Sequence, residues 1–324
     1  MADLPATEAV ASPAWRVGIA ALLAGVAFAF HTALGDMASI WANQADYSHG
    51  FLVPFIAAYI LYARRSRIPV TFTWPDPLGL VPLVLGVALS VAAGVTNFGK
   101  EFSQGVGFVL ALTGVLILCV GRLGLRWAWP GLLYLLFMVK LPDRLEIQFM
   151  FKLRQVATGG SNFLLQALGY PAYMTGPQGT IITVGELKLG VDWACSGLSM
   201  VLTFVALATA FAILLRERPL GDRLAILLSS LPIAIASNIL RITVTALVYL
   251  AGWKWLGDKI VHDLAGYLMM PLALGFIWAE LRLIDWLFVV PQKTDRDTVL
   301  KSGRQVQTAD WKVDKPPAPP EAGR

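Results

Sequence analysis

Long apolar runs separated by short charged segments dominate the chain. A helix of about 19 residues crosses the hydrocarbon core of a bilayer, and a window of that length fits most of these runs. The predicted spans lie at about 15–34, 50–63, 78–96, 105–121, 127–141, 196–215, 224–250 and 262–288. The second and fifth are short, so we expect them to be tilted or sheltered by their neighbours. The first has only Arg16 as a basic residue at its start and is followed by many spans, which indicates an uncleaved anchor rather than a signal peptide.

One predicted loop is long, from about 142 to 195, and its two halves follow different patterns. The first half, RLEIQFMFKLRQVATGGSNFLLQALG, mixes charged and large apolar residues. This mixture is typical of an interfacial or re-entrant helix, or of a helix packed within the loop. In the second half, apolar residues occupy every second position from Leu187 to Trp193, which predicts a strand with one buried face. Paired with residues 180–184, this strand forms a predicted β-hairpin that leads directly to Cys195.

Basic residues between the spans predict the orientation of the chain. Three groups of arginines follow the second span, join the fourth to the fifth, and join the sixth to the seventh, so all three fall on one side. These residues are Arg64, Arg65, Arg67, Arg122, Arg126, Arg216, Arg218 and Arg223. The positive-inside rule makes that side cytoplasmic. Both termini then lie in the cytoplasm, and the opposite loops, which show no basic bias, face the periplasm.

Composition supports a membrane protein and argues against other classes. Apolar residues make up 56% of the 324 residues and charged residues only 15%, whereas a soluble domain carries about 25% charged residues. The net charge of +5 comes from short clusters between spans, a pattern of topology signals that gives no indication of nucleic-acid binding. The predicted fold is an all-α polytopic membrane protein with about eight transmembrane helices and a small extracytoplasmic β-hairpin before the sixth.

Three regions follow from this pattern. Residues 1–14 form a short cytoplasmic N-terminus, and residues 15–290 form the transmembrane domain. Residues 291–324 end in DKPPAPPEAGR, and this charged, proline-rich segment is predicted to be a disordered cytoplasmic tail.

One of the two cysteines lies at the junction VDWACSGLSM, where the predicted strand ends and the sixth span begins. Ser196 is suited to cap the helix start, and Gly197 lets another backbone approach. The positive end of a helix dipole favours thiolate over thiol, so Cys195 is a candidate nucleophile. The alternative is an inert packing residue, which is how we interpret Cys119 among the leucines and valines of the fourth span. These two cysteines lie near opposite faces of the bilayer, too far apart for a disulfide.

Arg241, in SNILRITV, interrupts the seventh span. At 1.5 Å per residue it lies roughly 26 Å along the helix and therefore near the outer face. Ser237 and Asn238 share its helical face. A charge within a span is costly and marks a functional site by default, although a structural ion pair with Asp263 or Asp192 is the alternative.

His262, in VHDLAGYLMM, opens the eighth span at the same outer face. A lone histidine at a membrane boundary is most often an interfacial hydrogen-bonding residue, and His49 in YSHGFLVP competes with it for a catalytic role. Together, a thiol, an imidazole and a guanidinium on three late spans supply a nucleophile, a base and a cation for a developing oxyanion. The chain contains no HExxH or GxSxG motif, so we expect neither a zinc site nor a serine hydrolase, and no cofactor.

The segments ACSGLSM, SNILRITV and HDLAGYLMM, in this order on the last three predicted spans, resemble the exosortase/archaeosortase family of multi-pass membrane enzymes. YSHGFLVPFIAAYILYARR is similar to the N-terminal region of that family, and the resemblance covers about residues 15–290. It implies a transpeptidase-like enzyme with Cys195 as the nucleophile, Arg241 as the oxyanion-stabilising or substrate-orienting residue, and His262 as the general base. Supporting or substrate-binding roles are expected for Ser196, Gly197, Asn238, Asp263 and His49.

The resemblance also implies substrates and a location. The expected partners are the lipid bilayer and exported proteins that end in a short motif, a transmembrane helix and a basic tail, as in PEP-CTERM signals; no nucleic acid is expected. Histidine at the third motif favours a bacterial exosortase in the inner membrane, with its active site on the periplasmic side. Hydrolysis and transpeptidation both remain open.

A different class of protein is also compatible with the spans. A polytopic transporter, or a non-catalytic membrane assembly factor for exopolysaccharide export, would use Arg241 as a gating or substrate-binding charge. Inverted repeats with broken helices would favour this alternative, and we find no convincing internal repeat in the sequence.

Overall fold

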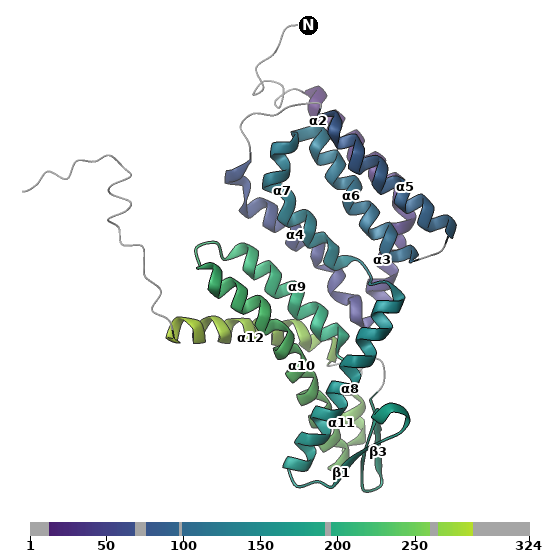
Figure 1. The fold of residues 1–324 in the computed structure, drawn as a ribbon, viewed down its shortest axis with the longest axis vertical. Coiled ribbons are helices and arrows are strands. Elements are labelled where there is room, and N and C mark those ends of the chain that lie inside the picture. The colour runs from purple at the N-terminus through teal and green to yellow at the C-terminus, as the bar shows by residue number, and fades with distance from the viewer. Residues whose placement is uncertain (1–12, 69–75, 97–98, 192–195, 260–264, 288–324) are drawn as a thin grey trace, which may run out of the picture. The chain divides into compact units, whose positions relative to one another are not determined.

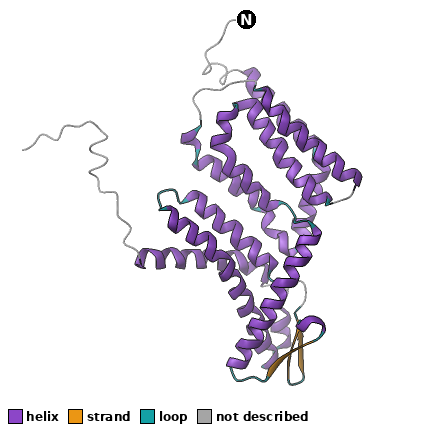
Figure 2. Ribbon diagram, viewed as in Figure 1, coloured by secondary structure: helices purple, strands orange, loops and turns teal. Residues whose placement is uncertain are grey.

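The computed structural model describes residues 13–68, 76–96, 99–191, 196–259 and 265–287. The chain divides into residues 1–281 and residues 282–324, and the elements below belong to the first unit apart from the end of α12. Most of this unit is helical (Figures 1 and 2). Its α-helices are α2 (Pro13–Ala29), α3 (His31–Asn43), α4 (Val53–Ala63), α5 (Leu80–Thr96), α6 (Lys100–Val120), α7 (Arg122–Tyr134), α8 (Asp143–Ala167), α9 (Leu198–Leu214), α10 (Leu220–Leu250), α11 (Lys254–Lys259) and α12 (Ala265–Leu287).

Short 3₁₀ helices and three strands complete the described chain. The 3₁₀ helices are η1 (Ala45–Phe51), η2 (Arg65–Arg67), η3 (Pro77–Gly79), η4 (Leu135–Met138) and η5 (Pro177–Gly179). The strands are β1 (Ala172–Thr175), β2 (Ile181–Val184) and β3 (Leu187–Gly190), and they form one antiparallel sheet in the order β1-β2-β3.

Fewer helices meet the requirements for a membrane span than the sequence predicts. In the described residues, three helices are long and apolar enough: Pro77–Thr96, α6 and α10. The pair α2 and α3, bent by 65°, makes a fourth if it is one span, and α9 is apolar but shorter. The structure therefore supports the membrane class but not the count of eight spans.

The predicted spans that fall short have physical explanations. The second is α4, only 11 residues long, and the fifth is α7, 13 residues long with Pro130 inside it. A proline lacks the N–H that continues a helix, and here α7 gives way to the 3₁₀ turn η4 a few residues later. The start of the predicted eighth span lies outside the described residues.

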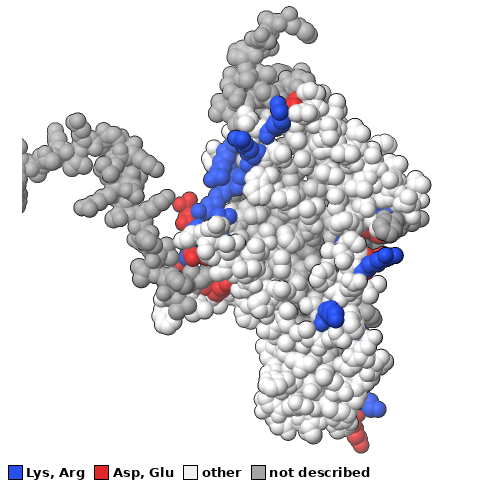
Figure 3. All heavy atoms as spheres, viewed as in Figure 1, with Lys and Arg blue, Asp and Glu red and all other residues white. Residues whose placement is uncertain are grey.

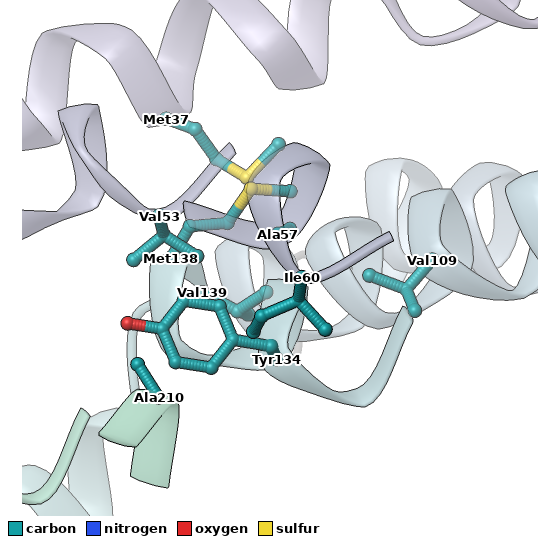
Figure 4. Packing of buried hydrophobic residues seen from close by; sticks show 9 residues of the cluster. All are labelled: Met37, Val53, Ala57, Ile60, Val109, Tyr134, Met138, Val139 and Ala210. Carbon is teal, nitrogen blue, oxygen red and sulfur yellow. The ribbon is translucent and has the colours of Figure 1, made fainter. Parts of the chain in front are cut away.

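A buried apolar cluster joins helices from both halves of the first unit. Side chains from α3, α4, α6, η4 and α9 surround Tyr134 of α7, which is 1% exposed (Figure 4). The labelled residues of the cluster are Met37, Val53, Ala57, Ile60, Val109, Tyr134, Met138, Val139 and Ala210. Burying a large apolar side chain contributes about 1.5–3 kcal/mol, so this cluster holds α3 and α4, which flank η1, against η4 and α9.

Three arginine-rich segments meet at one end of the first unit, as the sequence predicts. Arg64, after α4, donates hydrogen bonds to the carbonyl oxygens of Trp127 (2.9 Å) and Arg126 (3.3 Å) in α7. Burial, and then the charges of Arg216 and Arg67, lower the pKa of Arg64, so the segment between α9 and α10 is also close by. Figure 3 shows basic residues gathered on this part of the surface.

The predicted hairpin is present and leads towards the junction that contains Cys195. β2 and β3 pair with Val184 opposite Leu187, and the Val191 amide donates a hydrogen bond to the Thr180 carbonyl at 2.9 Å. From Leu187 to Val191 the apolar residues are the more buried ones, as the alternation predicts. Trp193 lies outside the described residues. Strand β1, which pairs with β2, was not predicted.

Helix α8 forms the first half of the long loop. One of its faces packs on α10 and the sheet through Ala157, Ser161 and Leu165. Its opposite face exposes large apolar side chains, among them Phe149 (53%) and Phe163 (68%). The C-terminal third of α10 joins the same apolar cluster, so α8 and the sheet fix the position of the helix that carries Arg241.

Candidate functional site

The first turn of α9 lies directly after the predicted nucleophile. Cys195 is outside the described residues, and the two residues that follow it, Ser196 and Gly197, are buried. The Ser196 hydroxyl accepts a hydrogen bond from the Leu198 amide at 3.3 Å, which satisfies an N–H of the first turn. Gly197 occupies the N-cap position in a left-handed conformation, with φ of 87°, which is readily adopted only by glycine.

Gly197 brings the start of α9 against α10. A Cβ atom built on Gly197 would lie 2.8 Å from Cγ of Asn238, so no larger residue fits without movement. The sequence predicts that Gly197 admits a neighbouring backbone; the close neighbour is instead the Asn238 side chain, which is 2% exposed. Asn238 precedes Arg241 by three residues, nearly one helical turn. The segments ACSGLSM and SNILRITV therefore meet in the structure.

The face of α10 around Arg241 is polar and turned into the protein. Ser237, Asn238 and Thr245 are 6%, 2% and 3% exposed, as expected for a polar stripe that avoids lipid. The preceding turn is held by α8, because the Ser161 hydroxyl donates a hydrogen bond to the Ile239 carbonyl at 3.0 Å. This contact limits the movement of α10 just before Arg241.

Asp46 of η1 is a site residue that the sequence did not single out. Its Oδ1 accepts a hydrogen bond from the Ser199 amide at 3.1 Å, and the Ser199 hydroxyl donates to the Ala45 carbonyl at 3.2 Å. Burial raises the pKa of Asp46, while the Ser199 amide and the charge of Arg241 lower it in part, so Arg241 is close enough to act on this carboxylate. The one signal in the sequence is that Asp46 directly precedes the segment YSHGFLVPFIAAYILYARR.

His49 lies on the same 3₁₀ helix but faces an apolar region. Its Nε2 is 3.1 Å from the Phe137 carbonyl oxygen, and burial lowers the pKa of its imidazole, which favours the neutral form. It borders a cavity of about 150 Å³ between α4, α7, α9 and α12. The other lining residues are Leu52, Val53, Ile56, Tyr134, Thr203, Ala206, Leu207 and Leu274. His49 therefore lines the same cavity as Thr203 of α9, which is about one helical turn after Ser199.

Some predicted site residues are not placed. Cys195, His262, Asp263 and Asp192 lie outside the described residues, so the structure brings together only Ser196, Gly197, Asn238 and Arg241, with η1 beside them. Within the described ranges, no three His, Cys, Asp or Glu side chains are arranged to hold a metal ion.

Comparison with known families classifies the chain. Residues 41–279 match the family model described as transmembrane exosortase (Exosortase_EpsH). The chain belongs to the transmembrane exosortase family. The match includes η1, the start of α9, and α10, the elements that meet at the candidate site of this exosortase-family protein. No curated protein and no solved structure matches the chain.

The second cysteine of this family member lies elsewhere. Cys119 of α6 is 3% exposed, in an apolar cluster with Val26, Phe30, Ala33 and Val115. This location agrees with its interpretation as a packing residue.

Proposed function

We propose that this protein is a membrane cysteine transpeptidase or protease that cleaves the C-terminal sorting signals of exported proteins at the extracytoplasmic face of the membrane. The observation that carries the proposal is the contact between Gly197 and Asn238. This contact links the segment containing Cys195 to the turn of α10 that precedes Arg241. Family membership supports the reaction class.

The proposed reaction assigns one role to each motif. His262 takes the thiol proton of Cys195, and the sulfur attacks the carbonyl carbon of the scissile peptide bond. Arg241 stabilises the negative oxygen of the tetrahedral intermediate, because a fixed cation is most effective where charge develops. The C–N bond then breaks, His262 returns the proton to the leaving amine, and a thioester remains on Cys195. An amine acceptor (transpeptidation) or water (hydrolysis) releases the product.

The proposed substrate ends in a recognition motif, a transmembrane helix and a basic tail. Its helix docks laterally, and this places the motif at the level of the α9 N-terminus. In the proposed topology, eight segments cross the bacterial inner membrane, both termini lie in the cytoplasm, and the arginine-rich end of the first unit faces the same side. The opposite end, with the sheet and α8, then faces the periplasm.

Thiol labelling in intact cells tests this proposal against the transporter or assembly-factor alternative. A membrane-impermeant maleimide should label Cys195 and stop processing of a co-expressed substrate, because it consumes the nucleophile from the periplasmic side. Cys119, buried in its apolar cluster, should stay unlabelled. A Cys195→Ala strain gives the background level of maleimide labelling. Lack of labelling at Cys195, together with unimpaired processing, would favour the alternative class.

A further inference from the structure

Asp46 lies in η1, a 3₁₀ helix that is fixed by several contacts. The Tyr47 hydroxyl accepts a hydrogen bond from the Leu141 amide at 3.2 Å, and His49 contacts the Phe137 carbonyl. Trp41 donates from its indole nitrogen to the Met138 carbonyl at 2.9 Å, and its ring leaves no space for a side chain at position 50. Three contacts therefore anchor η1 and its surroundings to η4 and the segment after it. Because η1 is fixed, the Asp46 carboxylate has a defined position.

The carboxylate reaches from η1 to two different elements. It accepts a hydrogen bond from the Ser199 amide in the first turn of α9, which satisfies an N–H that has no partner within the helix. Its negative charge also complements the positive end of the helix dipole. It also interacts electrostatically with Arg241 of α10. Asp46 thus connects the turn that follows the ACSG segment with the arginine of SNILRITV.

We propose that Asp46 is a positioning residue of the candidate site, which fixes the first turn of α9 and restrains the Arg241 guanidinium by its charge. The inference rests on the proposed function in one respect, namely that Arg241 and the residue before Ser196 act on the same substrate. Asp46 itself does not touch the reacting atoms. It acts by holding the first turn of α9 and the Arg241 side chain in fixed positions relative to each other.

The other charged groups around Asp46 define a control. Glu146 of α8 interacts electrostatically with Asp46, but it also pairs with Lys140 at 3.6 Å. Lys140 in turn binds Asp143 at 2.9 Å, and the Asp143 side chain is 64% exposed. An Asp143→Asn substitution therefore removes a carboxylate charge from the same neighbourhood without removing a contact to α9 or α10 seen in the structure.

The test compares Asp46→Ala, Asp46→Asn and Asp143→Asn in the full-length protein. Hydrogen exchange of peptides containing Ser199 should accelerate roughly 5–10-fold in Asp46→Ala, because the helix loses an N-terminal cap. The acceleration should be smaller in Asp46→Asn, whose amide oxygen still accepts a hydrogen bond. Turnover of a sorting-signal substrate should fall about 10–100-fold in both Asp46 variants, with KM changed little, because small displacements of reacting groups are costly. Asp143→Asn should match the wild type in both measurements.

Each other outcome has a defined meaning. Faster exchange with turnover equal to that of Asp143→Asn would overturn the positioning role, since Asp46 would then be only structural. Lost turnover with unchanged exchange in Asp46→Ala would overturn the proposed route through α9. The exchange measurement does not depend on activity. If Cys195→Ala still processes substrate, the proposed function fails while the effect of Asp46 on α9 can still be measured.

Discussion

Replacing Cys195 with alanine should leave the substrate full-length and membrane-anchored. If the sulfur forms the thioester, its removal deprives the reaction of its nucleophile, and processing should fall at least about 1,000-fold. Cys195→Ser should also be strongly impaired, because a serine hydroxyl is a much weaker nucleophile at neutral pH than a thiol. A time course of substrate length on immunoblots, with a tag on each side of the scissile bond, measures both variants.

Cys119→Ala provides the matched control for this prediction. It removes the same functional group from a buried apolar cluster, so a modest loss of stability is expected but processing should continue. Normal processing in Cys195→Ala would refute the assignment of the nucleophile. Equal loss in both cysteine variants would indicate a general folding defect and would remove the support for a specific role of Cys195.

Arg241→Gln should lower kcat by about 100–1,000-fold, with a small change in KM, if the guanidinium stabilises the oxyanion and not the bound substrate. Arg241→Lys should recover only part of this loss, because an ammonium group keeps the charge but not the planar, forked donor geometry. Single-turnover kinetics with a sorting-signal peptide, in detergent or reconstituted vesicles, would measure both variants.

The control for Arg241 is Arg122→Gln. The Arg122 side chain is 72% exposed and pairs with Asp76 at 3.1 Å at the start of α7, so its loss should leave turnover nearly unchanged. If Arg241→Gln retains kcat within about threefold of this control, the guanidinium has no role in the transition state. A rise in KM alone would assign Arg241 to substrate binding.

The sequence predicts local features of this fold better than its spans. The alternation from Leu187 to Val191 is readable because one face of β3 packs inward, and the structure confirms the hairpin. Strand β1 escapes prediction because its four residues, AYMT, are too few to show a period and two of them are exposed. Hydropathy predicts more spans than the described helices confirm, since an apolar run such as that of α4 forms only a short helix beside 3₁₀ turns.

In the candidate site, too, features that depend on neighbouring residues could be predicted from the sequence, whereas contacts between distant segments could not. The buried polar face around Asn238 follows from local sequence and agrees with the structure. Ser196 accepts a hydrogen bond from the Leu198 amide, but the N-cap of α9 is Gly197 and not Ser196, which the sequence predicted for the helix start. The contact of Asp46 with Ser199 joins residues 153 positions apart, and no local pattern distinguishes this carboxylate from other loop charges. The approach of Asn238 to Gly197 is likewise a tertiary contact, which the glycine alone indicates only in general terms.

The most direct measurement is the mass of the enzyme during turnover. Purified protein is mixed with a peptide carrying the recognition motif, quenched in acid and digested, and the acylated peptide is identified. The account predicts a mass increase equal to the amino-terminal portion of the substrate, located on Cys195, removed by hydroxylamine and absent from Cys195→Ala. Cleavage of the substrate without acylation of Cys195 under conditions that preserve thioesters, or with the acyl group on another residue, would contradict it.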